Sequence, residues 1–484
     1  MNTFMNPPIS PLLQAERQNS RAAWLIIALY SLITAAALLG GAGKVLNILF
    51  PVMSLLVGLF LYFKTPVMFV GFGWWMWFLA PFVRRFADFR SGFTDPSPIL
   101  MAPYLVGMVA MVTLIKYLPR TLQDGGISFA LPIVAIMYGF MLGLIQGSPL
   151  SVIRELFDWL VPILMGFHLY VNWRDFAIYY QNLQRTFIWG VLFTGLYGIF
   201  QYITGPEWDV QWLLNTGMTA ANGYASKELG AFAIRVFSTM QSAEPFSAFM
   251  AAGLLLILTS KGPLYIPATL AGYLSFLLSM ARSGWLGWAA GLITLVGFVK
   301  EKYQIRLIVT VLALTMIVIP VVTMEPFATD ITERVATLGS VEEDASAAGR
   351  KEAFQNSLIP ALSQVVGVGI GGGARDNTTI AIFYALGWPG TLLYVIGLSQ
   401  VISGVFKRSP DSTSPTMSSI RAVMVTALVR LPVNASLFGV SGAILWEFAG
   451  MGLAAQKYYL AQKQEEQLYH QLLLDGLLSE AVLE

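Results

Sequence analysis

The chain has 484 residues, of which 56% are hydrophobic and 12% charged, and its formal net charge is +2. Soluble domains carry about 25% charged residues, so this composition indicates a polytopic membrane protein. The absence of cysteine excludes disulfides, thiolate metal sites and cysteine nucleophiles, and two histidines cannot form a histidine metal cluster. No basic block suggests nucleic acid as a partner, and we expect no cofactor and no metal.

The apolar segments predict an all-α fold. About 20 apolar residues are needed to cross the hydrocarbon core of a bilayer. Fourteen segments qualify, several of them short, so we predict 12–14 transmembrane helices. No cleavage site follows an apolar core near the N-terminus, so we expect the first span to direct insertion. The candidate spans are 22–41, 45–63, 66–83, 98–117, 128–147, 156–172, 186–205, 242–259, 263–281, 285–299, 306–323, 380–402, 420–436 and 439–456.

The distribution of positive charge predicts the orientation. With the N-terminus in the cytoplasm, sixteen of the 29 Lys and Arg residues fall on the cytoplasmic side, as the positive-inside rule requires. Arg84, Arg85 and Arg90 fall on the outer side and run against this bias. We therefore predict that both termini are cytoplasmic and that two polar loops, 206–241 and 324–378, face outward.

Two regions follow from this topology. Residues 1–456 form a polytopic membrane domain, and residues 457–484 form a cytoplasmic amphipathic tail of mixed charge. His168 lies near the cytoplasmic end of a predicted span, where we interpret it as a core or interface residue.

Arginines provide the first candidate functional residues. Arg235 precedes the eighth span, Arg282 lies between two spans almost without a loop, and Arg350 lies in the long outer loop. A guanidinium stays charged and presents a planar fork of donors suited to phosphate oxygens. Three on one face could clamp a pyrophosphate. The structural alternatives are an interfacial anchor for Arg235, a snorkelling side chain for Arg282 and a solvated loop charge for Arg350.

Carboxylates at the outer boundary form the second class. An unpaired Glu244 would be costly there, so we interpret it as a base, a partner of Arg235 or a member of a structural ion pair. Asp376 and Asn377 end the long loop, where they could bind sugar or accept a proton, or simply cap the next helix. Asp344 is a further substrate-binding candidate, with a turn or cap as its alternative.

Two further patterns suggest structural roles. Residues Gly367, Gly369 and Gly372 formally match a dinucleotide-binding pattern, but no alternating strand–helix unit surrounds them, so we expect a tight turn near the membrane surface. Arg430 and Glu447 lie at similar depth in consecutive predicted spans. We predict that they form a buried ion pair.

Four stretches between residues 235 and 400 form a recognisable set. They are Arg235-Val-Phe-Ser with Pro245-Phe-Ser-Ala-Phe; Ser279-Met-Ala-Arg282-Ser-Gly-Trp-Leu-Gly; Glu333-Arg-Val with Glu343-Asp-Ala-Ser and Gly349-Arg350; and Gly367-Val-Gly-Ile-Gly with Asn377 and Leu386-Gly-Trp-Pro-Gly390. In these stretches the chain resembles the O-antigen ligase and O-antigen polymerase superfamily of bacterial inner-membrane glycosyltransferases. The first half of the chain resembles that superfamily only in hydropathy and topology.

This resemblance implies a GT-C-like helical architecture in the bacterial inner membrane. It also implies metal-independent transfer of a glycan from undecaprenyl pyrophosphate at the periplasmic face. In the family, arginines at the positions of Arg235, Arg282 and Arg350 are associated with the pyrophosphate. The implied partners are a lipid-linked oligosaccharide, the bilayer and a chain-length regulator.

The chain departs from the family's ligases at two positions. Ligases that join O-antigen to lipid A-core carry His-Asn where this chain has Asp376-Asn377, and an Asn-Pro-Asn after the first arginine is replaced by Ser242-Ala-Glu-Pro245. We therefore favour a polymerase that joins lipid-linked repeat units into a surface polysaccharide or exopolysaccharide. The alternatives are a ligase that acts on a lipid or protein acceptor and a membrane transporter, for example of inorganic carbon.

Overall fold

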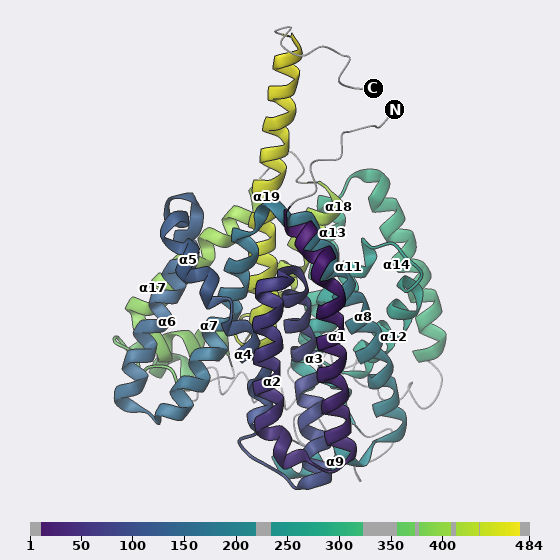
Figure 1. The fold of residues 1–484 in the computed structure, drawn as a ribbon, viewed down its shortest axis with the longest axis vertical. Coiled ribbons are helices and arrows are strands. Elements are labelled where there is room, and N and C mark those ends of the chain that lie inside the picture. Colours follow the sequence, from purple (N-terminus) through teal and green to yellow (C-terminus); the bar gives the residue numbers. More distant parts are fainter. Residues whose placement is uncertain are drawn as a thin grey trace.

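In a computed structural model of the chain, every regular element of the described residues is a helix (Figure 1), which confirms the all-α prediction for that part. The described residues are 11–218, 234–322, 356–372, 377–407, 413–434 and 436–474. Each of the fourteen predicted spans overlaps at least one helix.

Most consecutive helices with defined bounds are separated by short connections, except across residues 217–242 and 323–377. In chain order they are α1 (Pro11–Leu39), α2 (Gly43–Lys64), α3 (Pro66–Ser91), η1 (Pro98–Met101), α4 (Ala102–Met108), α5 (Met111–Thr121), η2 (Leu122–Gly126), α6 (Ile127–Gln146), α7 (Pro149–Val171), η3 (Trp173–Asp175), α8 (Phe176–Thr204), α9 (Glu207–Thr216), α11 (Ala243–Leu258), α12 (Tyr265–Leu278), α13 (Arg282–Phe298), α14 (Glu301–Val322), α17 (Thr378–Phe406), α18 (Pro415–Arg430) and α19 (Gly439–Leu474).

Six helical segments of the described part are long and apolar enough to cross a membrane, so the chain is a membrane-spanning protein. Large apolar side chains on the outside of the bundle, such as Leu25 and Ile48 at 71% exposure, support this assignment. They would be a liability in water but match a lipid environment. The orientation and the total number of crossings stay predictions. The six segments are Asn19–Leu39, Gly43–Lys64, Pro66–Ser91, Pro98–Gln146, Trp173–Thr204 and Thr378–Phe406.

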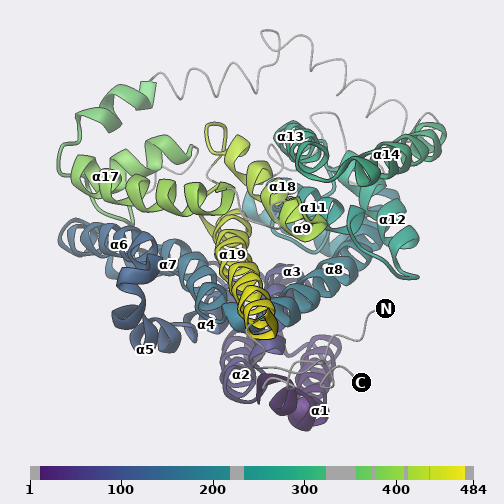
Figure 2. The ribbon, with the colours of Figure 1, turned by 90° about the horizontal axis from the view of Figure 1, so that it is seen from above.

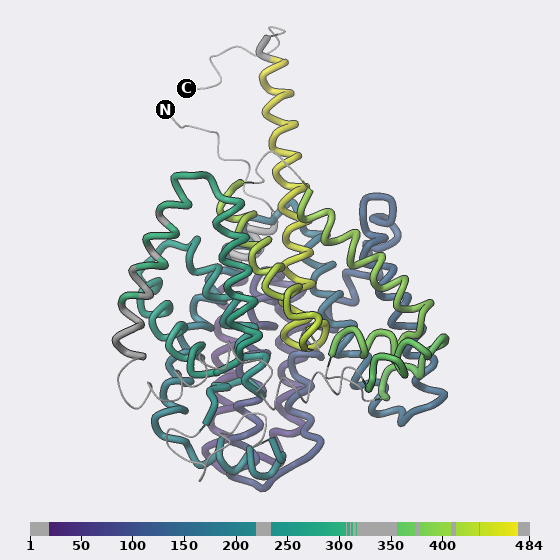
Figure 3. The backbone as a smooth tube through the Cα atoms, turned by 180° about the vertical axis from the view of Figure 1, so that it is seen from behind, coloured from purple at the N-terminus to yellow at the C-terminus, as the bar shows by residue number. Residues whose placement is uncertain are grey.

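Helix α19 forms the centre of the bundle. Seen from above, α6, α7 and α17 lie on one side of it and α11 to α14 on the other, with α1 and α2 at an outer edge (Figure 2). Helix α19 packs against α7 and α18, while α17 pairs with α6 and α12 with α8. The C-terminal part of α19 projects beyond the bundle, at the end where α1 begins (Figures 1 and 3). Thus the predicted tail begins as a continuation of the last apolar helix.

His168 lies inside the bundle, as predicted. Its side chain is buried, and its ring nitrogens form hydrogen bonds with the hydroxyls of Thr113 (2.8 Å) and Tyr179 (3.4 Å). A buried polar ring needs such partners because the apolar surroundings offer no water.

The central crossing of α7 and α19 depends on glycine. A Cβ atom added to Gly450 would lie 1.9 Å from the carbonyl oxygen of Gly166, and one added to Gly166 would lie 2.3 Å from that of Trp446. Small residues of this kind let helix backbones approach closely in membrane proteins. The contact therefore determines how near the central helix can lie to α7.

Helix α17 is interrupted at Gly387, and another part of the chain restores its hydrogen bonding. Gly387 has φ 57° and ψ −168°, and Pro389, which has no N–H, cannot donate to the carbonyl of Ala385. The N–H of Gly369 donates to that carbonyl instead, at 3.0 Å. The N–H of Val368 likewise reaches the carbonyl of Tyr384 at 2.9 Å. Broken helices persist in apolar surroundings only when the freed groups are paired in this way.

The glycine pattern thus has a packing role. Gly367, Gly369 and Gly371 all have positive φ, and a Cβ on Gly369 would lie 2.1 Å from the backbone nitrogen of Gly143 in α6. The segment therefore fits between α6 and α17 only without side chains at these positions. Part of the expected turn is present at residues 370–372, and the described residues around it contain no strand–helix unit.

We predict that Gly450→Ala lowers the stability of the protein by about 1–3 kcal/mol, as overpacking does in a close-packed core. A matched control is Gly297→Ala, since a Cβ at Gly297 meets no atom within 4 Å. That change is expected to be neutral or to stabilise α13 by about 0.5–1 kcal/mol. Thermal unfolding of the detergent-solubilised variants, followed by intrinsic fluorescence, measures both effects. Equal melting temperatures for the two variants would contradict the close-contact argument.

Candidate functional site

Among the described residues, the proposed side chains of Arg235, Glu244, Arg282 and Asn377 lie where α3, α8 and α12 end and where α7, α11, α13, α17 and α19 begin. Hydrogen bonds tie these helix ends together across long sequence distances, for example from Thr378 at the start of α17 to the carbonyl of Asn434 (2.7 Å). The prediction from topology is that this end faces outward. We call it the polar end of the bundle.

Arg235 lies against the turn that leads to Arg282. Its guanidinium donates to the carbonyls of Ser279 and Met280, both at 3.3 Å, and its side chain is half-buried. The N–H of Val236 adds a backbone bond to the carbonyl of Leu278 (3.0 Å). We call residues 279–282, together with the Arg235 side chain, the arginine turn.

The backbone of the arginine turn is strained. Met280 has φ 50°, a left-handed conformation that a residue with a bulky side chain adopts at a cost of roughly 1–3 kcal/mol. Arg282 follows as the first residue of α13. The positive end of a helix macrodipole lies there, which opposes a cation and favours an anion. The guanidinium of Arg282 and the helix terminus therefore add to one positive potential.

Glu244 forms an ion pair with Arg430, which confirms its predicted alternative as a member of a structural ion pair and corrects the partner expected for Arg430. The carboxylate also accepts from the Asn434 amide (3.3 Å), which in turn donates to the Ser283 hydroxyl (3.0 Å). The Arg430 side chain is buried, whereas the Glu244 side chain is 39% exposed. Glu244 is therefore paired with Arg430 rather than Arg235, and through Asn434 it is joined to the residue after Arg282.

The predicted Arg430–Glu447 pair is wrong. The buried carboxylate of Glu447 instead accepts a hydrogen bond from the indole of Trp74 (2.8 Å). Similar depth in consecutive spans is not sufficient for contact, because two helical side chains also have to point toward one another. Helix α11 offers a carboxylate at the end of the bundle where α18 terminates, and Arg430 uses that partner.

Asn377 caps α17. Its side-chain oxygen accepts from the N–H of Thr379 (2.8 Å), as an N-cap residue does, and its amide donates to the carbonyl of Pro432. The side chain is buried, so the cap and this contact occupy its polar atoms. Its predicted partners in the site, Arg350, Asp344 and Asp376, lie outside the described residues.

The segment between Arg235 and Glu244 is fixed by a residue that the sequence marked only as a charge against the predicted topology. Arg85, at the end of α3, donates to the carbonyls of Ser238 and Met240, both at 2.5 Å. It also pairs with the buried Asp209 of α9 at 2.7 Å.

Further partners complete this arrangement. Gln201 accepts from the N–H groups of Phe237 (3.0 Å) and Ser238 (2.8 Å). Its amide also donates to Asp209 (2.6 Å), to which the Tyr197 hydroxyl donates at 2.9 Å. Burial raises the pKa of the Asp209 carboxyl, and the Arg85 guanidinium opposes that rise.

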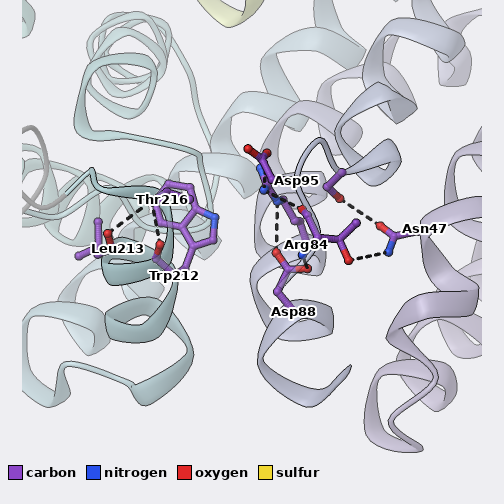
Figure 4. A network of polar contacts seen from close by, with 9 residues as sticks. Asn47, Arg84, Asp88, Asp95, Trp212, Leu213 and Thr216 are labelled. Atoms are coloured by element: carbon purple, nitrogen blue, oxygen red, sulfur yellow. Dashed lines mark hydrogen bonds and ion pairs between the residues drawn. The ribbon is translucent and has the colours of Figure 1, made fainter. Parts of the chain in front are cut away.

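Arg84, the neighbour of Arg85, is also held by polar contacts. Its guanidinium donates to Asp88 (3.3 Å) and to Asp95 (3.1 Å), both labelled in Figure 4, and to the carbonyl of Thr94 (3.0 Å). A signal in the sequence could have identified both residues, since Arg84 and Arg85 violate the charge bias of the predicted topology. Each has a carboxylate partner, so neither charge is left unpaired inside the bundle.

A cavity of about 750 Å³ opens beside these groups. Helices α3, η1, α4 and α7 and residues 439–441 form its walls, and Glu244 and Gln241 lie at its border with the segment that Arg85 holds. Glu155 of α7 lines it too and accepts from the N–H of Gly371 (2.6 Å), which links the cavity to the glycine segment. Glu244 is thus shared by the cavity and the polar contacts around the arginine turn.

Comparisons with known proteins add nothing to this description, since no family model, no curated protein and no solved structure matches the chain.

We predict that Arg85→Leu destabilises the protein by about 3–5 kcal/mol, because it leaves the buried Asp209 carboxylate without its cation. The double variant Arg85→Leu, Asp209→Leu removes both charges and is expected to recover a large part of this loss. Chemical denaturation in detergent compares the two variants with the unmodified protein. A double variant no more stable than Arg85→Leu would show that the ion pair is not the source of the effect.

Proposed function

We propose that the protein is a membrane glycosyltransferase that polymerises lipid-linked oligosaccharide repeat units at the outer face of the bacterial inner membrane. The observation that carries the proposal is the arginine turn. Arg235 is bound to the carbonyls that precede Arg282, and Arg282 opens α13, so two guanidiniums and a helix N-terminus belong to one short region. Such a region suits a pyrophosphate that gains charge as it leaves.

The proposed reaction is an inverting substitution. A hydroxyl oxygen of one lipid-linked unit attacks the anomeric carbon of a second unit, and the bond from that carbon to the pyrophosphate oxygen breaks. The electron pair stays with the undecaprenyl pyrophosphate, whose developing charge Arg235 and Arg282 stabilise. Glu244 orients the attacking hydroxyl and receives its proton. Arg350 and Asp376 are further candidates for the phosphate and acceptor contacts.

Support for the part played by Glu244 comes from its surroundings. Arg430 and Asn434 hold the carboxylate, Asn434 also binds Ser283 next to Arg282, and the carboxylate keeps a partly exposed edge toward the cavity. A catalytic carboxylate needs this combination of fixed position and access to the substrate.

The first test is a turnover assay on detergent-solubilised protein with undecaprenyl-pyrophosphate-linked oligosaccharide, EDTA and no nucleotide. Polymerisation gives a ladder of products. A single addition that requires lipid A-core would favour a ligase instead. No transfer from any lipid-linked donor would contradict the proposal and favour transport.

Arg282→Lys is expected to reduce turnover by roughly 100-fold, the loss that follows removal of one donor to a developing anion. Lysine keeps the charge but cannot present the planar fork. The matched control is Arg174→Lys at the opposite end of the bundle, where Arg174 stacks on Trp173. Unchanged turnover in Arg282→Lys, with the protein folded, would remove Arg282 from the phosphate contact.

A further inference from the structure

The cavity at the polar end has a charge pattern unlike that of the arginine turn. Its lining includes two guanidiniums, those of Arg84 and Arg154, and four carboxylates. Arg84 is paired with Asp88 and Asp95. Carboxylates therefore outnumber guanidiniums, and a pyrophosphate would be repelled. The four carboxylates are those of Asp95, Glu155, Asp158 and Glu244.

Several polar groups of the lining are held in fixed positions. Asp158, which is 6% exposed, accepts a hydrogen bond from the Tyr104 hydroxyl. Arg84 is 4% exposed, and its Nε and Nη2 atoms are held by Asp88, Thr94 and Asp95. A preorganised set of donors and acceptors loses little entropy when a ligand binds.

Ser441 adds an unused hydroxyl to the lining. Its side chain is 4% exposed and lines the cavity, yet its hydroxyl has no hydrogen-bond partner among the described residues. A buried hydroxyl without a partner costs roughly 1–3 kcal/mol, so buried polar groups are nearly always paired. A bound molecule with its own hydroxyl groups would supply the partner that the protein lacks.

The wall of the cavity also carries aromatic surface. Trp77 and Tyr104 line it and meet edge to face, with ring centroids 4.9 Å apart and an angle of 79° between their planes. Aromatic rings offer a rigid apolar surface beside polar handles. Pyranose rings present C–H groups on their faces and hydroxyls around their edges, which matches this lining. The volume of about 750 Å³ also lies in the usual range of small-molecule sites, about 300–1,000 Å³.

We propose that this cavity is a saccharide-binding subsite for an uncharged, hydroxyl-rich sugar and that it holds the acceptor end of the growing chain. The role as acceptor rests on the proposed function. Glu244 connects the two regions, because it lines the cavity and is joined through Asn434 to Ser283 beside Arg282. An acceptor hydroxyl in the cavity would reach Glu244 while the leaving pyrophosphate occupies the arginine turn.

The test measures binding separately from transfer. The probes are methyl glycosides of neutral hexoses, deoxyhexoses and N-acetylhexosamines, titrated onto the full-length detergent-solubilised protein. Saturation-transfer NMR reports contact with the ring protons, against the same detergent without protein. Ser441→Ala is expected to weaken binding roughly two- to ten-fold, the effect of one lost hydrogen bond. Tyr104→Phe, which removes the hydroxyl that holds Asp158, provides a second variant with the same expected direction.

A matched control is available at the other end of the bundle. Ser418 of α18 is also fully buried with a hydroxyl that has no partner among the described residues, but it does not line the cavity. Ser418→Ala is therefore expected to leave the affinity for the glycosides unchanged. Equal affinity in Ser441→Ala, Tyr104→Phe and the unmodified protein would overturn the proposal, as would the absence of binding by every probe. Displacement of a bound glycoside by inorganic pyrophosphate would also overturn it.

Transfer is measured in the same preparations, so that the two proposals fail separately. Polymerisation that proceeds at the same rate in Ser441→Ala and Tyr104→Phe would leave the glycosyltransferase in place and remove the acceptor role of the cavity. Glycoside binding that depends on Ser441, without transfer from any lipid-linked donor, would keep the saccharide site and remove the proposed reaction.

Discussion

The structure depends on one constraint, which is that polar groups inside an apolar bundle must find their partners within the protein. Arg85 shows the consequence most clearly. Its guanidinium binds Asp209 and two backbone carbonyls, so a charge that would be costly on its own connects α3, α9 and the segment before α11. Because that segment begins near Arg235 and ends near Glu244, one buried charge determines where both lie.

The same constraint acts at α17 and at Arg430. Residues 365–370 supply the hydrogen bonds that Gly387 and Pro389 remove from α17, and through Gly371 they reach Glu155 at the cavity. Arg430 is buried at the end of α18 and takes Glu244 as its partner. The contacts that pair these buried polar groups therefore also hold residues of the candidate site, namely Glu155 and Glu244, in position. Ser441 is one of several buried hydroxyls without a partner among the described residues, and it is the one that the proposed saccharide subsite uses.

Sequence patterns predicted the helices well but predicted pairing less well. Hydropathy indicated a helix at each candidate span because a bilayer requires about 20 apolar residues to cross it. Which polar side chains contact one another was harder to predict from the sequence. Arg430 and Glu447 lie at similar depth, yet each has a different partner. Arg84 and Arg85 stood out only as violations of the charge bias. Asp88 and Asp95, the partners of Arg84, are close to it in the sequence, but Asp209, the partner of Arg85, lies far away, so that pair could not be assigned from the sequence.

The sequence by itself determined that the chain is helical and membrane-spanning, and that arginines and carboxylates occur near the ends of its spans. These properties follow from composition and periodicity, which are local. Only the tertiary structure decided that Arg235 binds the turn before Arg282, that Glu244 pairs with Arg430 and that Asn377 is a helix cap. The physical reason is that the direction of a side chain depends on the rotation and neighbours of each helix, and close glycine contacts such as Gly166–Gly450 set these across the whole bundle.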